Sequence, residues 1–598
     1  MRNLGTLLIV CLLAPVIGHA DDVKGQTELA KQAYQILKDR CYRCHGGAAR
    51  QAGLDVLNRE NLLEERGDGT DKFAFVVPGD KDNSQLLDAI DGGADSYMPQ
   101  EGSPEAETMT DEEKQLLVQW VEQGAVFPKL REFEFISETK LLQAMRDHLL
   151  SIKDEDRRFY RYYSLVNLHN NPKVQELDLR LHRAALAKAV NSLSTKRDIY
   201  LPEVLPGTEE SVYALDLRKV GWDRGNLWGE ILSHYPYALK YEFVRDDELK
   251  QVWKDVARLS GADVPYVRAD WFIVTATQPP LYHQLLDIPD TLSELEDRLQ
   301  LDIVENILRG DVARSGYAKS GVSKQNRLLE RHTTPVTPYF WISYDFLPKR
   351  AKGDLVRFPL GPKFENHPHP NQAFEHDGGE IIWSLPNGMQ AYMLVDSKGE
   401  RINAGPVEVV FDRSAVLGTP TIINGISCMY CHREGMIVDF RDEIRDGQAL
   451  GGPAQEFVRE LFPPHQEMQR LTRGDQELFL RALEKVVGPF LQIGEDADKP
   501  IGQFPEPVGK VADMYSRDLT PQELALELSI EQPEILQAKI DANRQLLRFG
   551  LGPMIQTPPG TLKREKWETR DGTSLMQDVA SELRLGLPFV TAPSTSGD

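Results

Sequence analysis

The chain has 598 residues, enough for several domains at about 150 residues each. Hydrophobic residues make up 41% of it and charged residues 27%, which is the composition of an ordinary folded protein. The formal net charge of -23 argues against a nucleic-acid binder, which would show a basic patch, and against adsorption on an anionic membrane, whereas it would attract a basic partner protein.

Residues 1–20 have the three parts of a secretory signal peptide. Arg2 supplies the positive charge, residues 7–16 form the apolar stretch, and Gly18 to Ala20 form a small-x-small cleavage site. The apolar stretch is too short for a transmembrane helix, and no later run is long and apolar enough to span a bilayer. We therefore expect an exported, periplasmic protein with no transmembrane segment in the mature chain.

Two short runs, Cys41–His45 and Cys428–His432, share the pattern Cys-x-x-Cys-His. This is the attachment pattern of c-type haem. Two thiols on one helical turn add to the vinyl groups of one porphyrin, and the next histidine lies under the ring, where its imidazole can bind iron. The remaining cysteine, Cys11, lies within the signal peptide. Each thiol of the mature chain is thus assigned to a haem, and covalent attachment of haem normally follows export.

The two runs predict two covalently bound haem c groups, with Cys41, Cys44, Cys428 and Cys431 as the attachment sulfurs and His45 and His432 as iron ligands. Two alternatives fit the cysteines alone. The four thiols could close one tetrahedral zinc site, or each pair could form a redox-active disulfide. Neither alternative explains why a histidine directly follows each pair.

The first module is expected over residues 21–128. Its opening helix, residues 26–39, runs into Cys41. Residues 110–113 form a capping box that begins a second helix, which Gly124 ends. A first helix that carries the attachment site and a last helix that packs across it predict a small cytochrome c-like domain.

The first haem needs a sixth iron ligand or an open position. Met98 is the predicted ligand, because it follows His45 by enough chain to reach around the haem and Pro99 would stiffen its loop. Met109 is the rival, and Met98 could instead be a packing methionine. Ligation by histidine and methionine favours a raised potential and simple electron transfer.

The module also carries a set of residues in a recognisable order: Cys41–Gly47, Gly53–Asp55, Val77–Asp80, Ser84, Leu86, Leu87, Met98, Pro99, Thr110–Glu113, Trp120, Gly124 and Ala125. In these residues it resembles the planctomycete-type cytochrome c domain. The resemblance implies a compact fold with one haem and with His45 and Met98 as iron ligands. It covers about a fifth of the chain and names no substrate, because such domains are often fused to other modules.

A helical middle region without cysteine is expected over residues 129–320. Its amphipathic patterns predict helices over residues 137–152, 173–192 and 291–308. Aromatic clusters at residues 159–163 and 266–272 are interpreted as core packing rather than as a substrate groove or an electron path.

A second haem region is expected over residues 321–450, where the pattern changes to strands. Residues 380–385 and 389–396 are predicted strands joined by a hairpin turn at residues 386–388. Residues 397–399 resemble the next turn, and residues 407–411 are another predicted strand. The predicted fold class is therefore mainly α, with a cytochrome c-like domain at the N-terminus and a larger α+β second haem domain whose β-hairpin covers one side of the haem.

The distal side of the second haem has several candidate ligands. His376 is the leading one, because Gly378 and Gly379 give its loop freedom and because Asp377 or Glu380 could orient its ring. Alternatively, His376 is only part of a polar turn before the hairpin and binds no iron. Met436 follows the second run too closely to leave the proximal side, and the competing histidines are His367, His369 and His465.

The rest of the chain adds architecture but no reaction. Through residues 266–271, 376–381 and 385–388, the stretch from Tyr266 to Met436 is similar to a set of uncharacterised exported bacterial cytochromes. The two haem runs lie much farther apart than those of bacterial di-haem cytochrome c peroxidases, which disfavours a peroxidase of that type. A helical C-terminal region, residues 451–598, is expected to pack on the second haem region, with helices over residues 453–487 and 520–547 and a second capping box at Thr520.

The sequence therefore predicts an exported di-haem c-type cytochrome that carries out electron transfer in the periplasm with one or more redox partner proteins. The alternative is a haem-dependent oxidoreductase, peroxidase-like or oxygenase-like, with catalysis at the second haem. A third hypothesis is a sensory module in which the state of the haem changes contacts made by the middle region.

Overall fold

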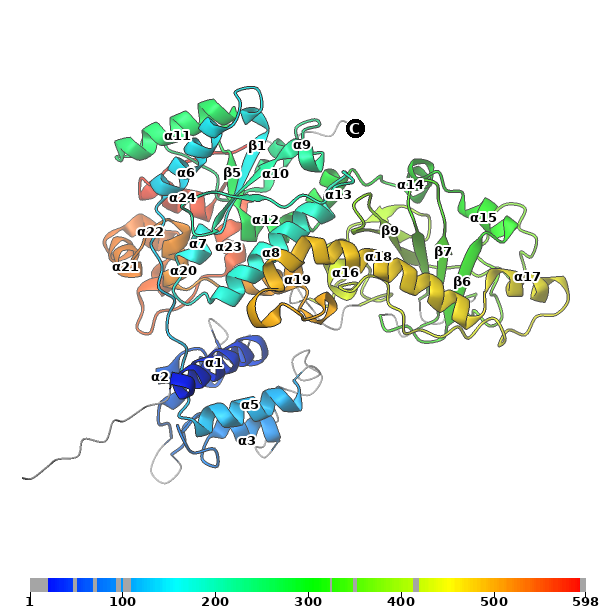
Figure 1. Ribbon diagram of the computed structural model, residues 1–598, viewed down its shortest axis with the longest axis horizontal. Helices are drawn as coiled ribbons and strands as arrows, with labels where there is room; N and C mark the ends of the chain where they lie inside the picture. The colour runs from blue at the N-terminus through cyan, green and yellow to red at the C-terminus, as the bar shows by residue number, and fades with distance from the viewer. Residues whose placement is uncertain are drawn as a thin grey trace, which may run out of the picture. The chain divides into compact units, whose positions relative to one another are not determined.

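The computed structural model describes residues 20–42, 44–46, 51–67, 72–92, 98–99, 109–322, 325–347, 352–411 and 419–591. The predicted signal peptide lies outside these ranges except for Ala20. The chain forms two compact units, Met1–Leu130 and Arg131–Asp598 (Figure 1). About 43% of it is helix and 13% strand, which confirms the mainly α fold with a smaller β region. No helix in the described ranges combines the length and the apolar character that a membrane span requires.

The first unit is a small helical module around one apolar core. Its helices are α1 (Ala20–Ile36), α2 (Arg59–Leu63), α3 (Gln85–Asp91) and α5 (Asp111–Glu122). A π-helical turn, Leu37–Cys41, extends α1 to the first cysteine, so the predicted opening helix begins earlier and ends later than residues 26–39. Helix α1 packs against α5, as predicted. The capping box is confirmed, because the Thr110 hydroxyl accepts from Glu113 N and Thr110 N donates to the Glu113 carboxylate.

A four-stranded sheet lies at the centre of one half of the second unit. Its strand order is β2 (Glu203–Val204), β3 (Val212–Asp216), β1 (Tyr160–Ser164), β5 (Tyr266–Arg268), with β1 antiparallel to β3 and parallel to β5. Successive side chains point to opposite faces. Tyr162 and Ala214 pack with α6 (Glu138–Ser151) and α11 (Asp247–Ser260), whereas Tyr163 and Tyr213 join the core on the side of α8 (Glu176–Ser192). Tyr162, Tyr163, Trp271 and Phe272 of the two aromatic clusters are thus core residues, as interpreted, whereas Phe159, Tyr160 and Tyr266 are half-buried.

Short helices and the C-terminal segment complete this half of the unit. The short elements are α7 (Val166–His169), α9 (Leu217–Val220), α10 (Leu227–His234), β4 (Leu239–Lys240), α12 (Ala269–Ala276) and α13 (Leu281–Leu286). The C-terminal elements are α19 (Pro507–Tyr515), α20 (Pro521–Glu527), α21 (Pro533–Ala542), α22 (Arg544–Arg548), α23 (Arg564–Glu568), β12 (Arg570–Asp571), β13 (Thr573–Ser574), α24 (Leu575–Glu582) and β14 (Leu587–Pro588). Strand β14 pairs with β4, and α19 packs against α8, α12 and α16 (Ile426–Cys431).

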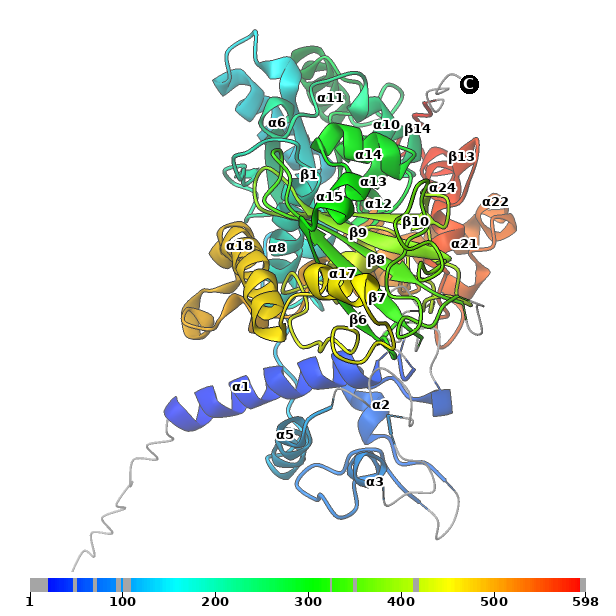
Figure 2. The same ribbon diagram turned by 90° about the vertical axis from the view of Figure 1, so that its right-hand side faces the viewer.

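The other half of the second unit contains a six-stranded antiparallel meander (Figure 2). Its order is β11 (Arg401–Ile402), β10 (Gln390–Asp396), β9 (Gly378–Ser384), β8 (Phe340–Asp345), β7 (Arg327–His332), β6 (Val312–Tyr317). The hairpin at residues 386–388 and the turn at residues 397–399 are confirmed by the pairing of β9 with β10 and of β10 with β11. Residues 407–411 are not a strand, because Val409 N and Val410 N donate to Pro406 O in a turn.

Three long predicted helices are interrupted. Residues 291–308 form α14 (Leu292–Leu299) and α15 (Ile303–Arg309), separated where Gln300 takes a left-handed conformation and Asp302 caps α15. The Pro463–Pro464 pair separates α17 (Pro453–Leu461) from α18 (His465–Leu491). Residues 520–547 form α20, α21 and α22, with Pro533 at the start of α21 and Asn543 capping α22.

The two faces of the meander have different neighbours. On one face, Arg331 and Trp341 donate to the Asp475 carboxylate of α18. On the other face, Asn306 of α15 hydrogen bonds the His332 ring. The first face continues beyond α18 toward α16, which carries the second cysteine pair, so the sheet provides one wall of the site described next.

Candidate functional site

The first Cys-x-x-Cys-His run lies at the end of the π-helical turn after α1. His45 N donates to Cys41 O at 2.9 Å, so the helical turn continues through the run. The His45 ring nitrogen Nδ1 lies 3.0 Å from the Gln51 carbonyl oxygen. A carbonyl can only accept, so Nδ1 carries the proton and Nε2 is the basic nitrogen of the neutral ring. This is the second-sphere contact that usually orients a metal-binding histidine.

The predicted methionine ligand of the first site is partly described. Met98 is half-buried, and its backbone N donates to Ala89 O at 2.8 Å, which ties it to α3. Met109, the rival, packs against the core of the first unit. Residues 93–97 and 100–108 lie outside the described ranges, so Met98 as an iron ligand stays a prediction.

The second run occupies α16 and the residue that follows it. His432 N donates to Cys428 O at 2.8 Å, and the His432 Nδ1 lies 3.1 Å from the Gly435 carbonyl oxygen. The Nδ1 of His432 is therefore the donor, as in His45, and its Nε2 is the basic nitrogen. Cys428 and His432 are buried, whereas Cys431 is exposed. Both runs thus present the same arrangement, although they lie in unrelated structural surroundings.

The start of α16 depends on a close approach of the backbone to α12 and α13. Gly425, the residue before the helix, has φ +88, and a Cβ atom there would lie 2.4 Å from the Thr277 carbonyl oxygen and 3.0 Å from the Tyr282 ring. Only glycine satisfies both the conformation and the space. The preceding residue, Asn424, is buried and donates its side-chain amide to His283 Nε2 at 2.7 Å.

The His283–Asn424 contact makes the stability of the second unit depend on pH. Burial, with a further contribution from Arg401, lowers the pKa of His283 from 6.5 to about 3. Between pH 6.5 and pH 3 the His283 side chain is protonated in the unfolded chain but neutral in the folded chain. Its contribution to the free energy of unfolding is therefore complete above pH 6.5 and is lost as the pH falls toward 3. Between pH 7 and pH 5 we expect a loss of about 2 kcal/mol in the free energy of unfolding, at about 1.36 kcal/mol per pH unit below 6.5.

Urea unfolding at pH 7 and pH 5 measures this loss. In His283→Gln the side-chain carbonyl can still accept from Asn424, but no proton is taken up, so the variant should lose less stability than the natural chain over the same interval. Equal losses in the two proteins would contradict the assignment of this pH dependence to His283.

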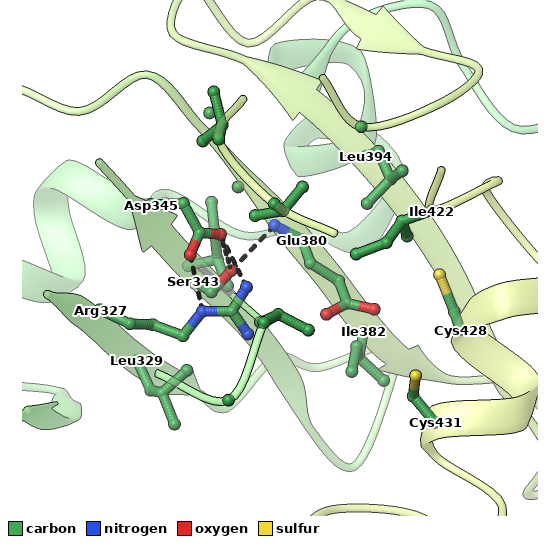
Figure 3. Close-up of a pocket in the computed structure, with 18 of the residues that line it drawn as sticks. Arg327, Leu329, Ser343, Asp345, Glu380, Ile382, Leu394, Ile422, Cys428 and Cys431 are labelled. Carbon is green, nitrogen blue, oxygen red and sulfur yellow. Dashed lines mark hydrogen bonds and ion pairs between the residues drawn. The ribbon is translucent and has the colours of Figure 1, made fainter. Parts of the chain in front are cut away.

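A cavity of about 800 Å³ lies between α16 and the meander. Figure 3 shows the sulfurs of Cys428 and Cys431 on one side of it and side chains of the sheet on the other. Most of its lining is apolar and comes from Leu329, Ile382, Leu394, Ile402, Val409, Val410, Ile422, Met436, Ile437 and Phe440. This volume and lining are those of a site for a cofactor-sized, largely apolar ligand.

One carboxylate faces the histidine across this cavity. Glu380 Oε2 lies 3.7 Å from His432 Nε2, and both side chains are mostly buried. Glu380 is held by its strand, where its backbone N donates to the Ser343 hydroxyl at 2.9 Å. Burial by itself would raise the pKa of the Glu380 carboxyl, but His432 and Arg327 lower it to about 2. Burial is the main cause that raises the pKa of the Cys428 thiol, and the Glu380 carboxylate raises it further.

His376 lies elsewhere. Its ring packs edge-on against Tyr344, with the ring centres 4.9 Å apart, and against Phe374 at 6.3 Å. Tyr344 follows Ser343 in β8, so alternation along the strand places it on the face opposite Ser343 and Glu380. Among the described residues that line the cavity, His432 is the only histidine. The other candidate ligands, His367, His369, His376 and His465, do not line it.

From the sequence alone, Glu380 is only a possible partner of His376. Alternation along the predicted strand places Glu380, Ile382 and Ser384 on one face, which was a usable signal. Its meaning depended on knowing that this face, and not the other, points toward α16. Local sequence does not contain that information.

A zinc site of the ordinary kind needs several ligands close together. Within the ranges that the structure describes, no group of three or more His, Cys, Asp or Glu side chains is gathered closely enough to hold a metal ion. Each run instead offers two sulfurs that could form thioether bonds to a porphyrin and one imidazole nitrogen that could bind its iron, which is what a covalently attached haem requires.

Comparison with known proteins finds a similarity for part of the first unit. No curated protein and no solved structure matches the chain. One family model matches, over residues 41–102, and this range begins at Cys41 and includes Met98. Domains of the cytochrome c type bind haem covalently and transfer electrons. The N-terminal module, residues 41–102, is therefore similar to the family described as Planctomycete cytochrome C, as the resemblance in its sequence predicted.

Proposed function

We propose that this protein is an exported di-haem c-type cytochrome that transfers electrons in the periplasm. The first haem c is held by Cys41, Cys44 and His45, and the second by Cys428, Cys431 and His432. The two haems would pass electrons between redox partner proteins and each other.

The main observation that supports a second haem site is the cavity beside α16. It is large enough for a cofactor, mostly apolar, and bordered by two cysteine sulfurs on one turn of a short helix. The Nδ1–H of His432 is used by the Gly435 carbonyl, which leaves Nε2 to bind iron. When bound there, haem supplies a one-electron redox centre, and the apolar lining excludes water from it.

The cationic side chains at the cavity also suit a haem. Lys319 and Arg441 line it and are exposed, so they can meet the carboxylates that a haem presents to solvent. Arg327 lines it too, but its guanidinium is held by Asp345 through two contacts of 2.7 and 2.9 Å. The buried ion pair keeps Arg327 fixed, whereas the two exposed cations can move toward a ligand.

In the first site we propose Met98 as the second iron ligand, opposite His45. Histidine–methionine ligation raises the reduction potential. The anionic surface, with a net charge of -23, would attract basic redox partners and speed their encounter at low salt. The predicted signal sequence at residues 1–20 supports export, which normally precedes covalent haem attachment.

Haem and metal content test this proposal. The exported protein, purified from a host that attaches haem c, should have the mass of the processed chain plus two porphyrins and should contain two iron atoms. A chain with one zinc ion and no porphyrin would overturn the proposal. A second haem that binds carbon monoxide when reduced and reacts with peroxide would favour the oxidoreductase instead of simple electron transfer.

A further inference from the structure

We propose that the Glu380 carboxylate is the second axial ligand of the haem iron that His432 holds, an inference that rests on the proposed second haem site. The proposal concerns the oxidised, ferric protein. It gives the two haems different ligand pairs, histidine with methionine in the first unit and histidine with carboxylate in the second.

The separation of the two donor atoms supports it. Imidazole nitrogens and carboxylate oxygens each bind first-row metal ions at about 2.0–2.2 Å. Two such donors on opposite sides of one metal ion are therefore about 4 Å apart, whereas donors at right angles are about 3 Å apart. His432 Nε2 and Glu380 Oε2 are 3.7 Å apart, which is closer to the opposed arrangement.

The two donors are also held by separate rigid elements. His432 ends α16 and is oriented by the Gly435 carbonyl, whereas Glu380 lies on the central strand β9 and is anchored by Ser343. Each donor thus reaches the cavity from its own wall. Donors fixed before the metal binds give a defined ligand geometry.

Glu380 is the best placed of the possible ligands. His376 contacts Tyr344 on the opposite face of the sheet. Met436 lines the cavity but follows His432 by four residues, which keeps its thioether near the proximal loop. Glu443 also lines the cavity, but its side chain is exposed and accepts from Ala318 N at 3.0 Å.

A carboxylate ligand has a direct electronic consequence. An anionic oxygen donor favours the more highly charged ferric ion over the ferrous ion, and axial ligand identity is a main determinant of haem potential. The second haem should therefore have the lower potential of the two, so electrons that enter at the second haem would move to the first. Oxygen donors are also weak-field ligands, so the ferric second haem should be high-spin.

The test compares full-length holoproteins that carry Glu380→Gln and Glu443→Gln. Both changes remove one carboxylate from the same cavity, but only the first removes the donor that faces His432. We expect Glu380→Gln to raise the potential of the second haem by at least about 59 mV, a tenfold change in its reduction equilibrium, and to alter its ferric electron paramagnetic resonance signal. Glu443→Gln should shift the potential by less than this.

Haem content separates this proposal from the one on which it rests. Two porphyrins in the natural protein with an unchanged potential and spectrum in Glu380→Gln would overturn the ligand assignment alone. A low-spin ferric signal for both haems of the natural protein would also overturn it, even if the variant does not fold. One porphyrin in the natural protein would overturn the second haem site itself. Loss of the second haem's signal in His376→Ala would return the assignment to His376.

Discussion

Replacing Cys428 and Cys431 together by serine is expected to leave a protein that carries one haem instead of two. Serine cannot form a thioether bond, so the second porphyrin would have no covalent attachment. His432 and the apolar cavity alone would hold it weakly. Mass spectrometry of the denatured protein should show the loss of one porphyrin, and the optical spectrum should retain only the haem of the first unit.

The matched control is the Cys41→Ser/Cys44→Ser variant. It should lose the other porphyrin and keep the signal of the second haem, because the two sites lie in different compact units. The zinc alternative makes a different prediction. If all four sulfurs held one zinc ion, either double variant would release that same ion, and neither would change the porphyrin content. That result would contradict both haem assignments.

Replacing Lys188 by methionine is expected to lower the free energy of unfolding of the second unit by about 3–5 kcal/mol. Lys188 Nζ lies 2.7 Å from Glu506 Oε1, and both side chains are almost fully buried. Glu506 also accepts from the first backbone amides of α19. Removing the cation leaves a buried carboxylate without its ion-pair partner, which is costly because water cannot solvate it.

This effect should spread to the second haem site, because α19 packs against α16 as well as against α8. Denaturant unfolding followed by circular dichroism measures the stability, and the haem spectrum reports the site. Two controls make the result specific. Arg470→Met breaks the exposed Arg470–Glu467 pair and should shift the unfolding midpoint little. Lys188→Met combined with Glu506→Gln should recover part of the loss, since no buried charge remains.

A loss of less than about 1 kcal/mol in Lys188→Met would mean that water reaches Glu506 in the variant. Such a result would show that the interface between α8 and α19 opens easily. The contact of α16 with this interface would then offer a way for the second haem site to respond to changes in the middle of the chain.

The capping boxes and the β9–β10 hairpin could be predicted from short segments of sequence. The capping boxes at Thr110 and Thr520 formed as predicted, because each involves a backbone amide and a side chain three residues away. The β9–β10 hairpin formed for the same reason, since its turn residues and the alternation of its strands are local. The match over residues 41–102 likewise begins at the Cys41–His45 run.

The long predicted helices show where local pattern is insufficient. Residues 291–308 carry a continuous amphipathic pattern, but the chain turns at Gln300 so that α15 can cover the meander. The small sheet of β1, β3 and β5 pairs residues about fifty or about a hundred positions apart in the sequence, so no short window of sequence displays it. Strand β14 likewise pairs with β4 from the opposite end of the unit.

The sequence by itself determined that each Cys-x-x-Cys-His run brings two thiols and an imidazole together, because they need only one helical turn, and the proposed haem attachment rests on this. Only the tertiary structure decided what faces that imidazole. Glu380 reaches His432 because a strand far back in the chain turns one of its two faces toward α16, whereas His376, four residues earlier, packs on the other face. Which face is turned depends on the packing of the whole sheet, and no short stretch of sequence specifies it.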